Sequence, residues 1–113
     1  MSFRSWLNVL CNTKRDSVGS TGQSTYATNL TDLAVIEFMP VDANTRERLV
    51  INTPYELFQT TCDAEQDVKP GDVLVPLNSV TVQNDLEYAV KAVERWPWRG
   101  RDYKLIVVED THR

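Results

Sequence analysis

The stretch Tyr103-Lys-Leu-Ile-Val-Val-Glu109 decides the fold class of this chain. Its four consecutive aliphatic residues place apolar side chains on both faces of an extended strand. A strand of that kind is covered on both sides, so it belongs in the interior of a sheet. The rest of the chain is expected to supply the strands and the cover around it.

Five shorter stretches with strand character precede it, at residues 7–11, 30–41, 55–62, 73–75 and 88–94. The last of these also suits a helical turn or two, but its β-branched Val90 and Val93 favour a strand. Lys69-Pro-Gly-Asp72 predicts a type II turn, because proline presets φ and glycine accepts a positive φ. No long amphipathic helix pattern is present, so we predict an all-β chain.

Six short strands separated by turns predict a small closed or partly open β-barrel, formed by residues 1–113 as a single domain. A Gly/Ser/Thr-rich segment predicts a flexible hairpin loop near residues 16–25. The positions expected to be largely buried are the aliphatic ones of the predicted strands: Val35, Ile36, Leu57, Val73, Val90, Val93, Leu105 and Val107.

A long projecting loop is predicted near residues 42–54, where the sequence has no clear period. It carries mixed charges followed by aliphatic residues: Arg46, Glu47, Arg48, Leu49, Val50 and Ile51. Exposed aliphatic residues in a row are costly unless a partner covers them. We therefore expect this loop to dock on a neighbouring subunit, with Arg46 or Arg48 paired to an acidic residue there. The alternative is that Leu49–Ile51 begin a strand and the arginines alone are exposed.

Composition limits the class of protein. The chain has 113 residues, of which 42% are apolar and 25% charged, with a net charge of -4, so a general DNA-coating protein is disfavoured. The N-terminal segment is too polar for a signal peptide, and no apolar run is long enough to cross a membrane. Cys11 and Cys62 form no metal-binding motif, and we expect two reduced thiols in a protein made in the cytoplasm.

Candidates for catalysis are poor. His112 is the only histidine and lies near the end of the chain, so a serine or cysteine nucleophile lacks its usual base. No glycine-rich phosphate loop is present. We predict no enzyme activity, no cofactor and no metal site. Asp63, Glu65 and Asp67 alternate and would share one face of a strand, where a solvated acidic edge is favoured over a cation site.

Aromatic and basic residues are interleaved near the C-terminal end: Arg95, Trp96, Trp98, Arg99 and Arg101. Such a cluster suits the corner of a barrel, a protein interface or a platform for nucleic acid. Charge is also uneven, because residues 53–87 are acidic and residues 88–104 are basic. Opposite patches of this kind make the contacts between copies in a head-to-tail ring complementary.

The order of these features resembles the head–tail joining proteins of tailed bacteriophages, the stopper or head-completion family. The resemblance rests on the successive motifs Leu10-Cys-Asn-Thr-Lys-Arg15, Leu33-Ala-Val-Ile-Glu-Phe-Met-Pro40, Asp67-Val-Lys-Pro-Gly-Asp72 and Tyr88-Ala-Val-Lys-Ala-Val93. It extends over nearly the whole chain. The chain departs from the family at Leu86-Glu87, where a glycine is usual, and in its long 76–85 connection.

The resemblance implies a structural virion protein of the phage neck. Such a protein forms a homo-oligomeric ring, commonly a dodecamer, that extends the portal DNA channel, retains packaged DNA and provides the tail docking surface. Its partners are the portal or adaptor protein above and the tail terminator or tail tube protein below. Double-stranded DNA passes without sequence-specific binding, and Asp63, Glu65 and Asp67 are candidates for an acidic channel wall. The residues expected at subunit or partner interfaces are Arg46, Glu47, Arg48, Leu49, Ile51, Trp96, Trp98, Arg99 and Arg101.

The competing hypothesis is a small β-barrel that binds nucleic acid directly through Trp96, Trp98, Arg99 and Arg101. The net negative charge weighs against it. A steep salt dependence of DNA binding would favour it.

Overall fold

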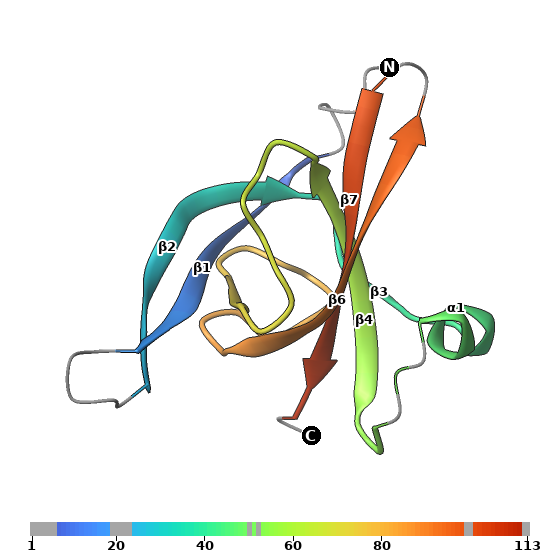
Figure 1. Cartoon of the computed structure of the whole chain (residues 1–113), viewed down its shortest axis with the longest axis horizontal. Helices are drawn as coiled ribbons and strands as arrows, with labels where there is room; N and C mark the ends of the chain where they lie inside the picture. The colour runs from blue at the N-terminus through green and yellow to red at the C-terminus, as the bar shows by residue number, and fades with distance from the viewer. Residues whose placement is uncertain (1–6, 19–23, 50, 52, 99–100, 112–113) are drawn as a thin grey trace.

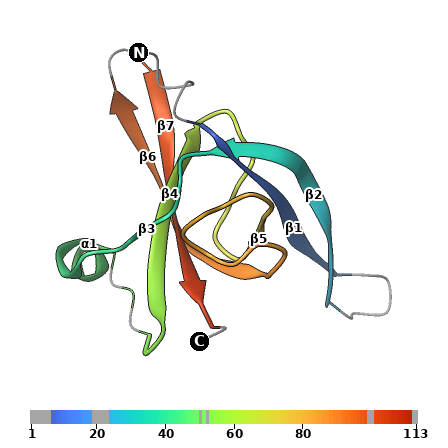
Figure 2. The same ribbon diagram turned by 180° about the vertical axis from the view of Figure 1, so that it is seen from behind.

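The computed structural model describes residues 7–18, 24–49, 51, 53–98 and 101–111, without the side chains of residues 16–18, 24–26, 98 and 101. In this part of the chain, seven strands form one antiparallel sheet, and a short helix stands beside it (Figures 1 and 2). The strands are β1 (Val9–Val18), β2 (Ser24–Val35), β3 (Met39–Pro40), β4 (Glu56–Asp63), β5 (Val73–Pro76), β6 (Tyr88–Trp98) and β7 (Arg101–Asp110). Helix α1 (Ala43–Arg48) lies between β3 and β4 in the chain.

The order of strands in the sheet is β2-β1-β5-β6-β7-β4-β3. The all-β expectation is therefore confirmed in its coarse form: the chain is mostly β, with one short helix. Of the expected closed or partly open barrel, the closed form is wrong, because the sheet does not close on itself. Seven described strands replace the predicted six.

The reason for the open sheet lies at its two edges. β2 ends at Val35, soon after Asp32 adopts a positive φ of 54° and the register with β1 shifts. β3 is two residues long and ends at Pro40, which has no N–H to continue a ladder. The chain that leaves β2 meets β4 next to β3, where the Ile36 amide donates to the Thr61 carbonyl over 3.0 Å and the Ile36 carbonyl accepts the Thr60 hydroxyl.

The core lies on the concave face of the sheet. It brings together Val9 and Cys11 of β1, Leu33 and Val35 of β2, Phe58 and Cys62 of β4, Tyr88 and Val90 of β6, and Ile106 and Val108 of β7. Of the eight predicted core positions, Val35, Leu57, Val73, Val90 and Val107 are buried, whereas Ile36, Val93 and Leu105 are partly exposed. The expectation for these three was wrong. Val93 packs against the core but stays partly exposed, and for Ile36 and Leu105 the periodicity of one strand does not show how far the second face of the sheet is covered.

The predicted loop at 42–54 is partly a helix. Asp42 caps it, since its carboxylate accepts the Thr45 amide over 2.7 Å, and alanine, arginine and glutamate then favour a helical turn. The helix has six residues, and no helix in the described parts of the chain is long and apolar enough to cross a membrane.

Most of the other predicted strands, and the predicted type II turn, are confirmed. The 55–62, 73–75, 88–94 and 103–108 strands are confirmed as β4, β5, β6 and β7. Gly71 has a φ of 93° and the Asp72 amide donates to the Lys69 carbonyl, as the predicted type II turn requires. The sequence also predicts a turn at Trp96-Pro-Trp-Arg-Gly100, but residues 96–98 form the end of β6 and residues 99–100 lie outside the described residues. The strand expected at 30–41 is divided between β2 and β3. The hairpin loop expected at 16–25 is shorter than predicted, because Ser17 pairs with Thr25 and Val18 pairs with Ser24. Residues 19–23 lie outside the described residues.

Candidate interaction surface

The last turn of helix α1 meets the convex face of β6. Arg48 is hydrogen bonded to the Glu94 carboxylate, and its guanidinium carbon lies 5.3 Å from the centroid of the Trp96 ring. The Trp96 indole N–H donates to the same carboxylate over 2.5 Å. We call Arg48, Glu94 and Trp96 the Trp96 patch. Two segments that the sequence marked separately, 46–51 and 95–101, thus come together in space.

The Trp96 patch is partly exposed to solvent, and its polar groups are hydrogen bonded to one another. Trp96 is 39% exposed although Arg48 lies over its ring. Its indole N–H has an acceptor in Glu94, so a partner could cover the ring without leaving that donor unpaired. Glu94 was missed by the sequence analysis, although its position two residues before Trp96 puts both side chains on one face of a strand.

Arg46 has an internal role. Its Nη2 donates to the Thr53 carbonyl over 2.6 Å and to the Tyr55 carbonyl over 2.8 Å, and so ties α1 to the chain that enters β4. Glu47 is exposed, whereas Leu49 and Ile51 are partly buried. The predicted pairing of Arg46 or Arg48 with another subunit differs from the contacts seen here, because both arginines already have partners in their own chain.

Of the other aromatic and basic residues between positions 95 and 101, the structure describes the side chain of Arg95 alone. Arg95 forms an ion pair with Asp102 across the β6–β7 hairpin, with Nη2 and Oδ2 2.7 Å apart. The side chains of Trp98, Arg99 and Arg101 lie outside the described residues, so their predicted role stays a prediction.

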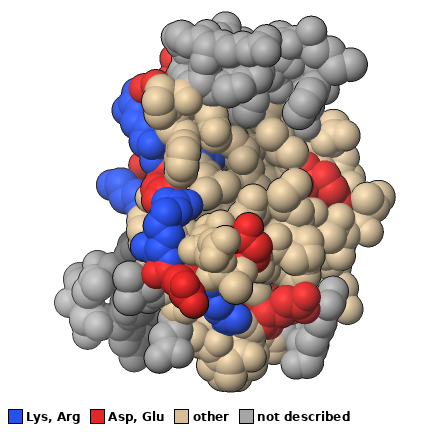
Figure 3. All heavy atoms as spheres, turned by 90° about the vertical axis from the view of Figure 1, so that its right-hand side faces the viewer, with Lys and Arg blue, Asp and Glu red and all other residues tan. Residues whose placement is uncertain are grey.

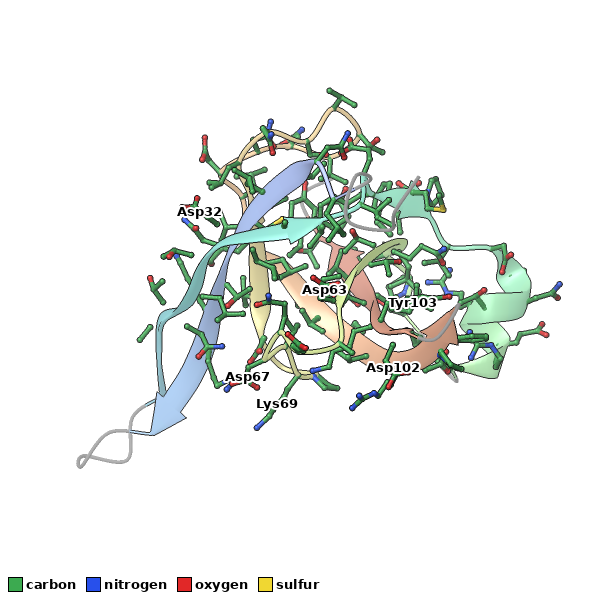
Figure 4. All side chains as sticks on the ribbon, turned by 90° about the horizontal axis from the view of Figure 1, so that it is seen from above. Asp32, Asp63, Asp67, Lys69, Asp102 and Tyr103 are labelled. Atoms are coloured by element: carbon green, nitrogen blue, oxygen red, sulfur yellow. The ribbon has the colours of Figure 1, made fainter. Side chains whose placement is uncertain are left out.

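The three acids predicted to share an edge lie in different surroundings. In Figure 4, Asp63 lies at the end of β4, while Asp67 lies beside Lys69 on the turn that leads to β5. Glu65 is exposed. Asp67 receives the Arg15 guanidinium, whose Nη1 lies 2.8 Å from its carboxylate. That hydrogen bond, followed by nearby positive charge, holds the pKa of Asp67 below its ordinary value.

Arg15 also holds Asp72 through two hydrogen bonds of 3.0 Å and 2.9 Å. Asp72 is 3% exposed and caps the turn by accepting the Lys69 amide. Asn29 of β2 donates to the Asp67 carbonyl as well. This Arg15 clamp fastens the β1–β2 hairpin to the 67–72 turn. No sequence signal joins these residues, since β1 and the turn are more than fifty positions apart.

The connection between β5 and β6 is organised around a carboxylate. Oε1 of Glu37 accepts hydrogen bonds from the Ser79 hydroxyl (2.9 Å), the Val80 amide (2.6 Å) and the Thr81 amide (2.7 Å). Partial burial raises the pKa of Glu37, but these hydrogen bonds outweigh it and leave the pKa lowered. The same carboxylate adds to the effect of burial on Cys11, whose pKa rises to about 12.

Charge that is uneven along the sequence is more balanced in space. Asp67, Asp72 and Glu87 of the acidic segment pair with Arg15 or Lys14 of β1. Lys91 and Arg95 of the basic segment pair with Glu109 and Asp102. Figure 3 shows basic and acidic side chains interleaved along one side of the face on the right of Figure 1, and further acidic side chains set apart in the rest of that face.

No three His, Cys, Asp or Glu side chains of the described residues could together hold a metal ion. No family model matches the sequence, and no curated protein and no solved structure shows significant similarity to it.

Proposed function

We propose that this chain is a ring-forming structural protein of the neck of a tailed bacteriophage, a head–tail connector of the stopper type. The proposal rests on the ordered motifs of the sequence, which resemble that family over nearly the whole chain. The mostly β architecture is consistent with the small β-domain that the resemblance implies.

The observation that carries a role in protein contacts is the Trp96 patch. Tryptophan and arginine are the residues most enriched among energetic hot spots of protein interfaces. Here they are held in a defined arrangement by Glu94, on a strand and a helix end, and remain partly exposed. Because the arrangement exists before binding, little side-chain freedom is lost on association.

The finer fold within this proposal is a partly open barrel. The contact at Ile36 and Thr61, between the chain that leaves β2 and β4, supports it. In the proposed ring, the portal or adaptor protein lies above and the tail terminator or tail tube protein lies below, and DNA passes through the channel. Of the three acids suggested for the channel wall, Asp67 is the least suited, since Arg15 neutralises it.

The alternative is direct binding of nucleic acid through Trp96, Trp98, Arg99 and Arg101, and the described basic neighbours of Trp96 lend it little support. Arg48 and Arg95 are both paired with carboxylates, and those carboxylates would repel a phosphate backbone. Titration of purified protein with labelled DNA at several salt concentrations decides between the two. A steep loss of binding with salt would favour the nucleic-acid hypothesis.

The test of the connector proposal is a tagged copy of this chain expressed in cells that produce particles carrying it. We expect affinity-purified particles to show the chain by cryo-electron microscopy as a cyclic ring between portal and tail. Trp96→Ser is expected to reduce tailed particles and leave the protein folded, whereas Met39→Ser, at another exposed apolar residue, serves as the matched control. A position on the capsid surface, or a monomeric state in the virion, would overturn the proposal.

A further inference from the structure

Residues 79–84, which we call the tip of the β5–β6 connection, are tied to a distant part of the chain through one carboxylate. Oε1 of Glu37 accepts hydrogen bonds from the Ser79 hydroxyl (2.9 Å), the Val80 amide (2.6 Å) and the Thr81 amide (2.7 Å). Glu37 lies between β2 and β3, more than forty positions away in the chain. Three donors from consecutive residues thus converge on one oxygen atom, which is the arrangement of an anion-binding turn.

The other hydrogen bonds of the tip are local. The Ser79 amide donates to the Asn84 side chain, and the Val82 amide donates to the Ser79 hydroxyl. The Gln83 amide donates to the hydroxyl of Tyr88, the first residue of β6. These bonds set the shape of the tip, whereas the bonds to the carboxylate set its position over the rest of the molecule.

The tip covers part of the core. Val82 is 6% exposed and belongs to the core cluster, together with Phe38 and Tyr88. Phe38 directly follows Glu37, so the segment that supplies the carboxylate is itself packed into the core. Movement of the tip away from Glu37 brings the Val82 side chain into water and leaves the strands in place.

The ionisable groups around Glu37 do not replace the tip as its partner. Burial, followed by the charge of Glu37, raises the pKa of Cys11 in β1 to about 12, so this thiol stays neutral. Asp85 and Glu87 of the same connection are acidic, and Glu87 is paired with Lys14 of β1 at 2.9 Å. Partial burial also raises the pKa of Glu37, and the hydrogen bonds to the tip outweigh that effect and leave the pKa lowered. The charge of this carboxylate is therefore stabilised by the tip.

We propose that residues 79–81 form a carboxylate-binding site and that Glu37, its ligand from the same chain, is a latch that holds the tip closed. When the carboxylate is protonated or removed, the tip opens and exposes Val82 while the sheet stays folded. The sign follows from linkage: the closed tip favours the charged carboxylate, so the charged carboxylate favours the closed tip, and acid opens it. A small free carboxylate fits the same three donors once the Glu37 side chain is gone. This latch is independent of the connector role proposed above.

Amide hydrogen exchange of the full chain, followed by NMR, tests the latch. The informative amides are those of Ser79, Val82 and Gln83, because their acceptors are not Glu37 and remain present in every Glu37 variant. Glu37→Ala is expected to speed their exchange about tenfold or more, the equivalent of one hydrogen bond to a charged group, and to leave β4 and β7 protected. Added formate is expected to restore protection, whereas chloride at the same ionic strength is not.

Two further samples separate the charge from the side chain. Glu37→Gln keeps the shape of the residue and removes its charge, and it is expected to speed exchange at the same three amides. The wild-type protein is expected to do so as the pH falls through the pKa of Glu37, after correction for the intrinsic pH dependence of exchange. Glu47→Ala removes an exposed glutamate of α1 and is the matched control, with exchange at the tip unchanged.

Each possible failure identifies a different part of the proposal. Unchanged exchange at Ser79, Val82 and Gln83 without the Glu37 carboxylate would overturn the latch. An equal loss of protection in β4 and β7 would show unfolding of the whole chain and overturn local opening. Opening that formate does not reverse would overturn the carboxylate-binding site. If Glu37→Ala does not fold, Glu37→Gln and the wild-type pH series decide on the latch by the same amides.

Discussion

Replacing Ile106 or Leu105 by alanine tests how the sheet is oriented. The two residues are neighbours on β7 and isomers of each other, so alanine removes the same number of carbon atoms from each. Ile106 is fully buried in the core, whereas Leu105 faces the other side of the sheet and is partly exposed. Any difference between the two variants therefore reports burial.

The expected magnitudes follow from the atoms removed. Three buried carbon groups at about 0.8 kcal/mol each, together with a cavity contribution, give a loss of about 3 kcal/mol for Ile106→Ala. Leu105→Ala is expected to cost about 1 kcal/mol, because part of its side chain is already in water. With a urea m-value of about 1.5 kcal/mol/M, the midpoints fall by about 2 M and about 0.7 M.

Urea unfolding followed by tryptophan fluorescence and far-ultraviolet circular dichroism measures both midpoints. Coincident curves from the two probes establish that a two-state treatment is valid. Equal losses for the two variants, or a larger loss for Leu105→Ala, would refute the assignment of the concave face as the core.

Three further predictions concern polar and thiol groups. Glu37→Gln is expected to lower the free energy of unfolding at pH 7 and to change it little at pH 3. The reason is that a carboxylate with a lowered pKa stabilises the fold above its pKa in the unfolded chain, about 4.3, and this stabilisation is lost as the pH falls through its pKa in the folded protein. Urea midpoints at both pH values measure the effect, and an equal loss at both would contradict the role of the charge. Arg15→Met is expected to cost about 2 kcal/mol, since it strands the buried Asp72 carboxylate, and a melting temperature equal to that of the wild type would show that the clamp is dispensable. Both cysteines are buried with pKa values raised to about 12, so Ellman's reagent at pH 8 is expected to react with them slowly in the native protein and rapidly in denaturant; fast native reaction would place a thiol at the surface.

Local sequence patterns predict the parts of this fold that depend on local physics. The 103–109 stretch identifies β7 because four aliphatic residues in a row suit a strand covered on both faces. The Pro70-Gly71 pair identifies its turn because its conformation is set by those two residues. Helix α1 was missed because it is too short to show a period, although the Asp42 cap was a usable sign.

Features that depend on distant parts of the chain were not predictable. Whether a sheet closes depends on the register and length of its edge strands, and neither the early end of β2 nor the short β3 can be read from one segment. The Arg15 clamp and the Glu37 contacts join residues that only the tertiary fold brings together. The Trp96 patch is intermediate: both of its segments were marked from the sequence, but not their contact with each other.

The order of strands also constrains how the protein can be made. β6 and β7 follow all other strands in the chain, yet they lie between β5 and β4 in the sheet. Until the ribosome releases them, β5 and β4 lack the two strands that lie between them in the sheet. An isolated two-stranded pair such as β3–β4 is marginal in water. The nascent chain is therefore expected to remain unfolded until its C-terminal hairpin emerges, and to depend on chaperones until then. A chain that stops before β6 should accordingly show no cooperative melting, whereas the full chain should show a single transition.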